Sequence, residues 1–350
     1  MYEYVGNIHV HSTYSDGSGT VEDIALAAEK AGLDFVIITD HEKLTGRLEK
    51  KNGWHGKTLV LIDTELNRDD HHYLAFNLKE EINTRGLSPQ EVIDTVNQAG
   101  GFGIIAHPFE KGSPIILKGK HYPWSQWGVK DFLGIEIWNY TSLCRDAATS
   151  TLKALWLYYF AHRSAARYPC RFSIKKWDEF LTQGNKVFAM GGTDAHAVRF
   201  RWKGLNINFF PYEYLFKTIN THVLLHEKFS QEGRYDSQLI YQALCRGHYH
   251  TSNDGIMPST GFRFTAENEE KQGISGDHIP LDKETALEVR SPTSRSRIRI
   301  IKDGQVISES QNSHLILKVL EKGAFRAEVY YRPLVGKARP WIYSNPIFII

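Results

Sequence analysis

Two histidines stand one residue apart near the start of the chain. The stretch NIHVHSTYSDGSGT, residues 7–20, contains His9 and His11 and, five residues after the second histidine, Asp16. Alternate residues of a β-strand point to the same side, about 7 Å apart along the strand, so both imidazoles can hold a single metal ion. The pattern is weak by itself, because two histidines on a polar strand face would give the same sequence.

Histidine and carboxylate residues recur where other apolar runs end. They are Asp40 and His41 after residues 35–38, Glu65 after 59–62, His107 after 103–106, and Asp194 and His196 after 187–190. The carboxyl ends of the parallel strands in an α/β barrel converge on one mouth, where catalytic residues gather. Ligand-type side chains delivered there from five strands are hard to explain as solvated surface, so the sequence predicts a metal site.

Alternating strand and helix patterns are expected to bring these side chains together. Short, uninterrupted apolar runs are typical of parallel strands buried on both faces. Helix signals separate the runs: Thr20 is a candidate N-cap with Gly32 as the stop, and Ser88-Pro89-Gln90-Glu91 is a capping box with proline at the first helical position. This alternation predicts an α/β domain with a parallel sheet over residues 1–250, with a mainly helical insertion near 142–183.

The pattern changes after residue 250. Residues 260–350 contain segments that alternate apolar and polar positions, such as Leu287-Glu288-Val289, separated by turn signals such as Asp303-Gly304. A long helical pattern is absent from this part of the sequence. We therefore expect a second domain over residues 251–350, a small antiparallel β-sandwich.

Composition and charge indicate a soluble globular protein. Of the 350 residues 41% are hydrophobic and 23% are charged, and the formal net charge is +2, which disfavours an extended polyanionic partner such as nucleic acid. The three cysteines are too scattered for a disulfide framework, no signal peptide fits before His9, and no apolar run reaches the roughly 20 residues of a membrane span. We expect a cytoplasmic protein without membrane association that acts on a small-molecule substrate.

In combination, the motifs resemble the polymerase and histidinol phosphatase (PHP) family of metal-dependent hydrolases. The residues that carry the resemblance are, in order, His9-x-His11 with Asp16, Thr39-Asp40-His41, Glu65, His72, Ala106-His107-Pro108 and Asp194-x-His196. The resemblance implies a distorted seven-stranded (β/α) barrel that holds two or three divalent metal ions, commonly zinc, manganese or iron. One departure is Glu42, at a position where many members carry aspartate.

Further stretches are similar to the carbaryl-hydrolase-like (CehA/McbA) branch of that family. They are Ala106-His107-Pro108-Phe109-Glu110, Gly134-Ile135-Glu136-Ile137-Trp138-Asn139 and Trp341-Ile342-Tyr343-Ser344-Asn345-Pro346-Ile347. A C-terminal β-domain is also expected in that branch, so the resemblance spans nearly the whole chain.

Carried over residue by residue, the resemblance implies three groups of metal ligands. The first is His9, His11 and Asp194; Glu65 would bridge it to a second group with His72 and His107; and Asp16, His41 and His196 would form the third. His72 is preferred to His71 because Tyr73-Leu74 follows it as an apolar pair does in the family. Imidazole and carboxylate ligands suit zinc, manganese or iron and do not select among them.

A di- or trinuclear site of this kind implies a hydrolase. Bridged metals lower the pKa of a shared water, which yields a metal-bridging hydroxide, and they bind the charge that develops on the substrate. Three metals suit cleavage of a phosphomonoester or phosphodiester, so a phosphoesterase with a phosphorylated substrate is the leading hypothesis. The alternatives are hydrolysis of a carbamate, ester or amide, which needs only two of the metals, and a non-catalytic binding protein that keeps the cluster structurally.

The expected catalytic set is Asp40, Glu65, Asp194 and Arg199. Asp40 is expected to orient a liganding histidine or to relay protons, although it can equally cap the end of a strand. Arg199 is a candidate for binding a substrate phosphate or carboxylate, although it can also be an ordinary surface residue. Glu136 and Asn139 are candidates for the pocket wall, with packing and turn formation as the alternative.

Overall fold

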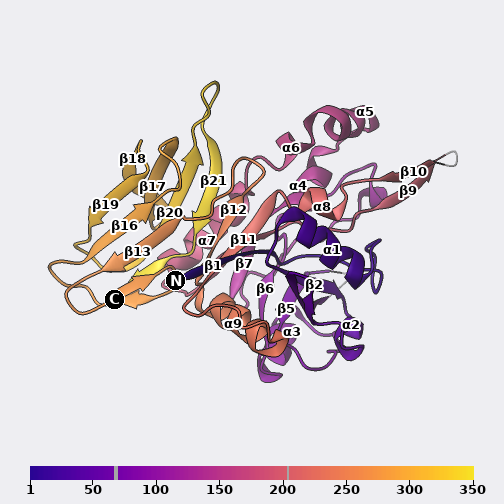
Figure 1. The fold of residues 1–350 in the computed structure, drawn as a ribbon, viewed down its shortest axis with the longest axis horizontal. Coiled ribbons are helices and arrows are strands. Elements are labelled where there is room, and N and C mark those ends of the chain that lie inside the picture. Colours follow the sequence, from indigo (N-terminus) through magenta and orange to yellow (C-terminus); the bar gives the residue numbers. More distant parts are fainter. Residues whose placement is uncertain (67–69, 203–204) are drawn as a thin grey trace.

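The computed structural model describes residues 1–66, 70–202 and 205–350, and the side chains of residues 161–163, 199–202 and 205–208 lie outside that description. It has a mixed α/β fold in which one sheet runs through the whole molecule (Figure 1). Helices surround the part of this sheet that the first 250 residues form. The C-terminal strands stack at the other end of the molecule, and both chain termini lie near that end.

The N-terminal part of the sheet has the hydrogen-bonded order β12-β11-β1-β2-β4-β5-β6-β7-β8, with β3 beside β4. These strands are β1 (Tyr2–Asn7), β2 (Phe35–His41), β3 (Gly53–His55), β4 (Thr58–Leu66), β5 (Tyr73–Phe76), β6 (Phe102–Ile105), β7 (Gly134–Asn139), β8 (Phe188–Gly192), β11 (Ile219–Leu225) and β12 (Tyr249–Asn253). A separate hairpin consists of β9 (Arg199–Trp202) and β10 (Leu205–Asn208).

Strands β2 and β4 are the centre of the N-terminal part. They pair in parallel from Phe35 opposite Leu59 to His41 opposite Glu65. Every residue of both strands is buried, which explains why each contains an uninterrupted apolar run. Because the register is fixed along the whole pair, His41 and Glu65 emerge next to each other at the carboxyl end.

Strand β5 departs from the parallel pattern expected from the sequence. It pairs antiparallel with both β4 and β6. The connection from β4 is too short for a parallel crossover, which needs a dozen or more residues. The reversal has a consequence for the site, because it returns His72 to the end of β4 that carries Glu65.

The segment after β8 returns to the continuation of β1. Val10 and Ala195 form an isolated parallel bridge, in which His11 N donates to Ala195 O at 2.9 Å and Ala195 N donates to His9 O at 3.1 Å. On its other side, Val10 O accepts a hydrogen bond from Thr39 N at 2.7 Å. The first and last of the predicted ligand motifs therefore meet at one end of the strands.

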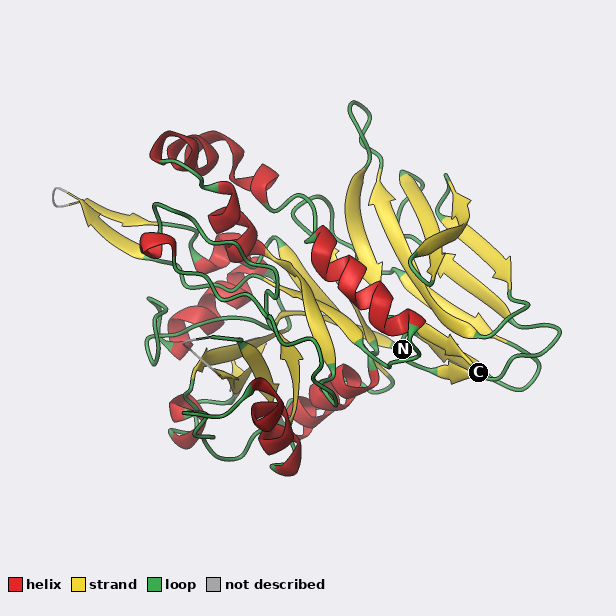
Figure 2. Cartoon of the chain, turned by 180° about the vertical axis from the view of Figure 1, so that it is seen from behind, coloured by secondary structure: helices red, strands yellow, loops and turns green. Residues whose placement is uncertain are grey.

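Helices pack around this part of the sheet (Figure 2). They are α1 (Val21–Ala31), α2 (Thr45–Leu48), α3 (Pro89–Gln98), α4 (Tyr140–Ala147), α5 (Thr151–Trp156), α6 (His162–Ala165), α7 (Arg171–Thr182), α8 (Tyr212–Leu215) and α9 (Gly233–Arg246), with short turns η1 (Leu117–Gly119) and η2 (Leu157–Ala161). The predicted capping boxes are confirmed: Thr20 begins α1, which ends at Gly32, and Ser88 begins α3.

Replacement of Thr20 by alanine is expected to lower the free energy of unfolding by about 1 kcal/mol. Thr20 Oγ1 accepts a hydrogen bond from Asp23 N at 3.2 Å, and alanine leaves that amide without its partner. Thr20→Gly should cost only about a few tenths of a kcal/mol, because glycine is itself a tolerated N-cap. Urea denaturation of the two variants checks this, and an equal cost for both would show that the cap does not contribute.

The C-terminal strands form two layers that are antiparallel except where β15 pairs in parallel with β22. One layer is the four-stranded sheet β14-β13-β16-β19, and the other continues the large sheet through β21, β20, β17 and β18, with β22 and β15 at its edge. Their bounds are β13 (Arg263–Glu267), β14 (Gln272–Ile274), β15 (His278–Ile279), β16 (Ala286–Arg290), β17 (Ser296–Lys302), β18 (Gln305–Ser310), β19 (His314–Lys318), β20 (Gly323–Tyr331), β21 (Arg339–Ser344) and β22 (Ile347–Ile349). A second cluster of buried apolar side chains, among them Phe264, Leu287 and Trp341, belongs to these strands. The mixed α/β class with a C-terminal antiparallel sheet is thus confirmed.

The large sheet continues past residue 250. Strand β12 pairs antiparallel with β21 near the end of the chain. The side chain of Asn345 reaches back further, because its Oδ1 accepts a hydrogen bond from Ala189 N at 2.8 Å and its Nδ2 donates to Gly247 O at 3.3 Å. The boundary proposed between residues 250 and 251 therefore falls inside β12, and the last strands of the chain are bonded to the first part.

A buried charged cluster joins β1, β11 and the loop after β12. His222 Nδ1 lies 2.9 Å from Glu3 Oε1, and His222 Nε2 lies 2.9 Å from Asp254 Oδ2. Burial lowers the pKa of His222, but Asp254 and Glu3 outweigh it and raise the pKa to about 9. His222 is therefore an imidazolium that both carboxylates stabilise.

Stability is expected to fall between pH 6.5 and pH 9 because of His222. The pKa of this group is raised from 6.5 to about 9 on folding, so its stabilising contribution is complete below pH 6.5 and is lost as the pH rises through 9. The contribution is on the order of 3 kcal/mol. Urea denaturation of the wild type and His222→Gln across this range checks it: the stability difference should shrink towards alkaline pH, whereas a constant difference would contradict the prediction.

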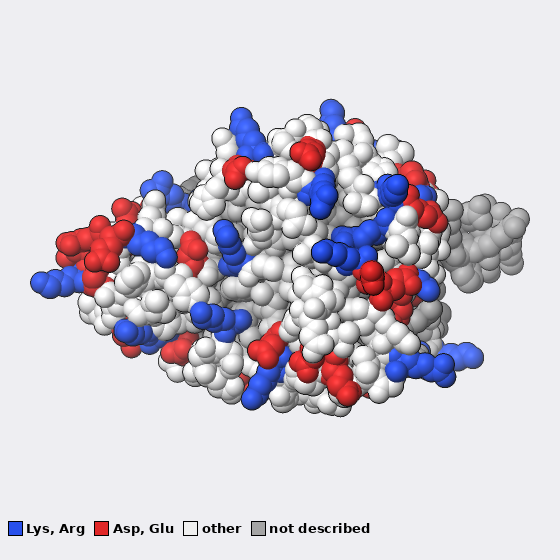
Figure 3. Space-filling model, turned by 90° about the horizontal axis from the view of Figure 1, so that it is seen from below, with Lys and Arg blue, Asp and Glu red and all other residues white. Residues whose placement is uncertain are grey.

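Two observations concern the helices and the surface charges of the molecule. Within the described ranges, no helix is both long enough and apolar enough to cross a bilayer. Basic and acidic side chains are interspersed over the face shown in Figure 3.

Candidate metal centre

Glu65, at the end of β4, is surrounded by five histidines. Its side chain is 1% exposed. Oε1 lies 2.9 Å from His72 Nδ1 and 3.2 Å from His107 Nε2, and Oε2 lies 3.2 Å from His11 Nε2 and 3.3 Å from both His9 Nε2 and His41 Nδ1. The two carboxylate oxygens thus face two different histidine groups, which is the arrangement that a bridging ligand requires.

Asp194 is a second carboxylate at the centre of the cluster. It follows β8, and its side chain is 8% exposed. Its Oδ1 lies 3.2 Å from His11 Nε2 and 3.4 Å from both His9 Nε2 and His196 Nδ1. The imidazoles of His9 and His11 are therefore close to Glu65 and Asp194 at once.

Asp16 connects this cluster to solvent. Its side chain is 40% exposed, whereas those of His11 and His41 are 0% and 7% exposed. Its oxygens lie 3.3 Å from His196 Nε2, 3.6 Å from His41 Nε2 and 3.7 Å from His11 Nδ1. Asp16 is therefore the most exposed of the nine predicted ligands, followed by His196 at 19%.

All nine predicted ligands thus converge on one region. Their donor atoms form groups whose members lie within 4.8 Å of one another: His9, His11 and Glu65; His41, Glu65 and His72; His9, His107 and Asp194; and His11, Asp16, His41 and His196. These four groups share more members than the three ligand groups that the family resemblance implies. Glu65, His9, His11 and His41 each belong to two of them.

Imidazole nitrogens without hydrogen-bond partners indicate that these residues fit metal ions. Within the described residues, the buried nitrogens that lack a hydrogen bond are, in this cluster, His9 Nε2, both nitrogens of His11, His41 Nδ1 and His107 Nδ1. Buried polar atoms in proteins are nearly always hydrogen-bonded. A lone pair of a neutral imidazole that faces carboxylate oxygens instead suits a divalent cation.

Burial and neighbouring charges shift the pKa values of the cluster in opposite directions. Burial lowers the pKa of His41 to about 3, so this ring stays neutral. Burial also opposes protonation of His11, but Asp194 and Glu65 outweigh it and raise its pKa to about 10. Burial raises the pKa of Glu65 and Asp194, but the surrounding histidines hold both well below their usual values. Both carboxylates are therefore ionised.

Two of the predicted ligands have unusual backbone conformations. His107 and Asp194 have φ values of 24° and 52°, in the left-handed region that residues with a side chain rarely adopt. Each comes two positions after the end of a strand, His107 after β6 and Asp194 after β8. Strain of this kind is concentrated at functional sites in proteins.

Glu136 on β7 supports the cluster from outside. Its Oε1 lies 3.1 Å from His9 Nδ1, and its Oε2 accepts hydrogen bonds from His107 N and Asn139 Nδ2, each at 2.9 Å. The carboxylate therefore fixes the ring of His9, with Nε2 directed at Glu65 and Asp194. Of the two interpretations given by the sequence for Glu136, the structure places it beside the predicted ligands.

Glu110 and Arg145 form a further buried pair that the sequence does not identify. Arg145 Nη1 lies 2.7 Å from Glu110 Oε1, and Glu110 Oε2 lies 3.9 Å from His107 Nδ1. Arg145 lies on α4, 35 residues after Glu110 in the sequence, so the pairing of the two residues depends on where the fold places this helix. Glu110 is the last residue of the sequence motif Ala106-His107-Pro108-Phe109-Glu110, and the motif alone assigns it no role.

The remaining predicted residues have separate outcomes. Asp40 accepts hydrogen bonds from Ser12 N at 2.7 Å and Ser15 Oγ at 2.6 Å, and it contributes no atom to the ligand groups of the described residues. His71 lies outside those groups as well, with its Nε2 2.7 Å from Ser125 Oγ. The side chain of Arg199 lies outside the described part of the chain, so its predicted role stays a prediction.

Known proteins provide an independent comparison. The sequence of residues 7–250 matches the model of the PHP domain. The uncharacterized protein MJ1587 of Methanocaldococcus jannaschii is 31% identical over 125 residues, which cover 31% of this chain and 68% of that protein.

Two solved structures resemble the fold. One is a two-domain protein from Bacteroides vulgatus containing a predicted PHP-like metal-dependent phosphoesterase, with 14% identity, a TM-score of 0.43, and coverage of 99% of this chain and 95% of that one. The other is PsfC from Pseudomonas syringae, with 13% identity, a TM-score of 0.41, and coverage of 68% and 88%. Assignment to the CehA/McbA branch stays a prediction. Because the matched region takes up well over half of the sequence, the chain belongs to the PHP domain family.

Proposed function

We propose that this protein is a metal-dependent hydrolase and that its main reaction is cleavage of a phosphomonoester or phosphodiester. The observation that carries the proposal is the convergence of nine histidine and carboxylate side chains on one region, with buried imidazole nitrogens that have no hydrogen-bond partner among the described residues. A purely structural cluster would be expected to pair these nitrogens internally.

The proposed ligand sets are the three that the family resemblance implies. Glu65 Oε2 lies near His9 and His11, and its Oε1 lies near His72 and His107, so Glu65 would be shared between a first set with His9, His11 and Asp194 and a second set with His72 and His107. Asp16, His41 and His196 would hold a third ion. Bound divalent ions, proposed as zinc, manganese or iron, supply an activated water at neutral pH and stabilise negative charge on the substrate.

The protein's own contribution is to position and ionise these ligands. Glu136 holds the Nδ1 side of His9, so that His9 Nε2 faces Glu65. Asp40 holds the turn that leads to Asp16 through hydrogen bonds from Ser12 and Ser15. We therefore propose that Asp40 is a positioning residue that fixes the approach to Asp16.

The third group of ligands favours phosphoester cleavage over carbamate, ester or amide hydrolysis. Attack on a carbonyl needs two metal ions, whereas a third ion can hold the additional oxygens of a phosphoryl group. Asp16, His41 and His196, with His11, provide donor atoms for that third ion on the side open to solvent. A substrate can therefore approach where this group lies.

The experiment that tests the proposal measures hydrolysis of three chromogenic substrates, a phosphomonoester, a phosphodiester and an aryl carbamate, by protein reconstituted with manganese or zinc. We expect phosphoester turnover in the wild type and none above background in His9→Ala, with a lower metal content of that variant. Carbamate turnover alone would replace the proposed reaction with the alternative. No turnover of any substrate by metal-loaded protein would favour the non-catalytic binding protein.

The adjacent residues His71 and His72 provide a matched control. Only His72 has a nitrogen near Glu65, whereas His71 bonds to Ser125 and Asp70. We expect His72→Ala to lower both metal content and turnover, and His71→Ala to leave both close to the wild type. Equal losses of metal content and turnover in the two variants would show that the losses come from damage to the fold and not from removal of a metal ligand.

Glu136→Gln is expected to weaken metal binding by about 10- to 100-fold, which is the usual cost of losing the partner of a liganding histidine. The amide keeps the size of the side chain but not its charge, so the ring of His9 loses the carboxylate 3.1 Å from its Nδ1. Titration of the metal-free variant with zinc, followed by competition with a chelator, measures the affinity. Glu136→Asp should recover part of it, and an affinity equal to the wild type in Glu136→Gln would contradict the role.

A further inference from the structure

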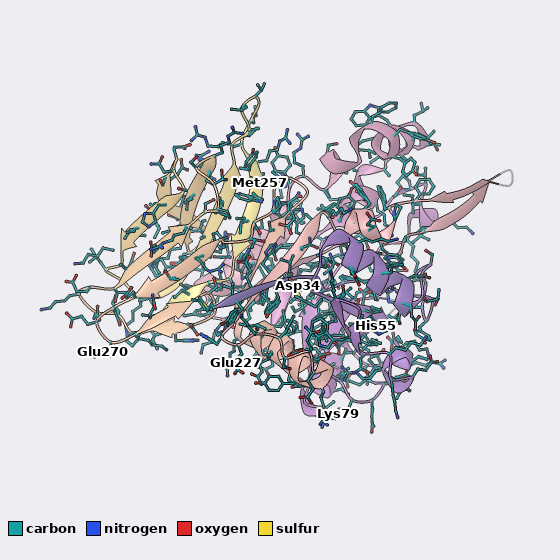
Figure 4. The ribbon with its side chains drawn as sticks, viewed as in Figure 1. Asp34, His55, Lys79, Glu227, Met257 and Glu270 are labelled. Carbon is teal, nitrogen blue, oxygen red and sulfur yellow. The ribbon has the colours of Figure 1, made fainter. Side chains whose placement is uncertain are left out.

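A cavity of about 250 Å³ lies outside the metal centre, where three parts of the chain meet. It is lined by Tyr140 at the start of α4, Ala166 and Arg167 after α6, Thr218 before β11, Asn253, Gly255 and Ile256 at and after the end of β12, and Arg339 at the start of β21. None of these residues is one of the nine candidate ligands. Met257, the next residue along from Ile256, lies in Figure 4 between the C-terminal strands and the helices that follow β7.

The lining is positively charged. It contains two arginines, Arg167 and Arg339, and no acidic side chain. Both arginines are half-buried, and within the described residues neither guanidinium has an ion pair or a side-chain hydrogen bond. Asp254, the carboxylate next in sequence to the lining, is taken up by His222 and Ser252.

Half-buried arginines elsewhere in the molecule have carboxylate partners. Arg145 pairs with Glu110 at 2.7 Å, and Arg299 pairs with Glu309 at 2.9 Å. This contrast matters because a guanidinium withdrawn from water loses hydration that a counter-ion normally replaces. Two half-buried arginines that line one cavity without a carboxylate partner among the described residues therefore indicate that a negatively charged group completes the site.

From these observations we infer that the cavity binds the oxyanion of a small molecule, a phosphate or a carboxylate group. Guanidinium groups bind both through paired N–H donors, and two of them can hold one anion from different sides. The volume lies just below the range of about 300–1,000 Å³ that is usual for pockets of drug-sized ligands, so a small ligand fits better than a macromolecular segment. Asn253 and Tyr140 also line the cavity, and the hydroxyl of Tyr140 is bonded to that of Tyr214 at 2.9 Å.

The test is a binding titration of the as-purified protein with inorganic phosphate, with succinate and with chloride at matched ionic strength, by calorimetry and by the shift in melting temperature. Because phosphate can also bind at the metal centre, the titration is repeated in His9→Ala. We expect phosphate or succinate, but not chloride, to bind in both proteins. Binding of phosphate alone would identify a phosphate group as the natural ligand chemistry, and binding of succinate alone would identify a carboxylate.

The double variant Arg167→Gln, Arg339→Gln should bind the anion at least about tenfold more weakly, since each charged hydrogen bond contributes that much or more. The exposed pair Arg85→Gln, Arg234→Gln is the matched control and should bind as the wild type does. If the double variant does not fold, as judged by circular dichroism, Arg167→Gln alone provides the test and should also weaken binding. Unchanged affinity in a folded Arg167→Gln or double variant, or no binding beyond that of chloride, would overturn the inference.

Discussion

Replacement of Glu65 by glutamine should reduce turnover by at least about 10³-fold, because the loss of a bridging charge removes several kcal/mol of stabilisation from the metal ions and the transition state. The substitution preserves the size of a side chain that is 1% exposed, so the fold should persist. Both of its oxygens lie within 3.3 Å of imidazoles, and an amide presents a poor ligand on one side and donors to the ring nitrogens on the other.

The measurement is turnover of the best phosphoester together with the metal content of the variant. We expect the content to fall by more than one ion per chain, since Glu65 belongs to two ligand groups. The solvent-facing Glu213→Gln, which has the same change of charge, should retain both properties. Full metal content in Glu65→Gln with intact turnover would refute the bridging role.

Removal of the metal ions should lower the stability of the wild type by about 3 kcal/mol or more. A ligand at about a hundred times its dissociation constant stabilises the folded state by about 2.7 kcal/mol, and two or three tightly held ions exceed that value. Treatment with a chelator, followed by thermal denaturation before and after zinc or manganese is restored, measures the effect.

Two further measurements decide how this loss of stability on metal removal is interpreted. His9→Ala should show a smaller change on chelation, because it begins with weaker metal binding. A melting temperature that does not respond to chelation, in protein whose metal is shown to have been removed, would mean that the cluster is assembled by the fold alone and that the ions contribute nothing to its stability.

The sequence predicted much of the metal centre because ligands at strand ends follow a simple rule. His41 and Glu65 end two parallel strands with a fixed register, so their meeting requires only that β2 and β4 are neighbours. The helix caps at Thr20 and Ser88 depend on residues within one turn and were predicted for the same reason. Local patterns of this kind are visible in the sequence before any long-range contact forms.

Features that depend on distant parts of the chain were not predictable. The antiparallel direction of β5 depends on its pairing with both β4 and β6, and the positive φ values of His107 and Asp194 are visible only in the folded backbone. The support of His9 by Glu136 spans 127 residues. A cavity that combines Arg167 with Arg339 depends on the joining of the C-terminal strands to β12, which no local pattern indicates.

The continuity of the sheet across β12 and β21 has a practical consequence for dividing the chain. Cutting after residue 250 would remove most of β12 together with its partner β21, and would leave the N–H and C=O groups of β11 as an open edge, which is a template for association with other chains. It would also remove Asn345, whose Oδ1 accepts a hydrogen bond from Ala189 N on β8, the strand that leads to Asp194. The isolated first part should therefore aggregate, because the C-terminal strands cover this edge of the sheet that carries the candidate metal ligands.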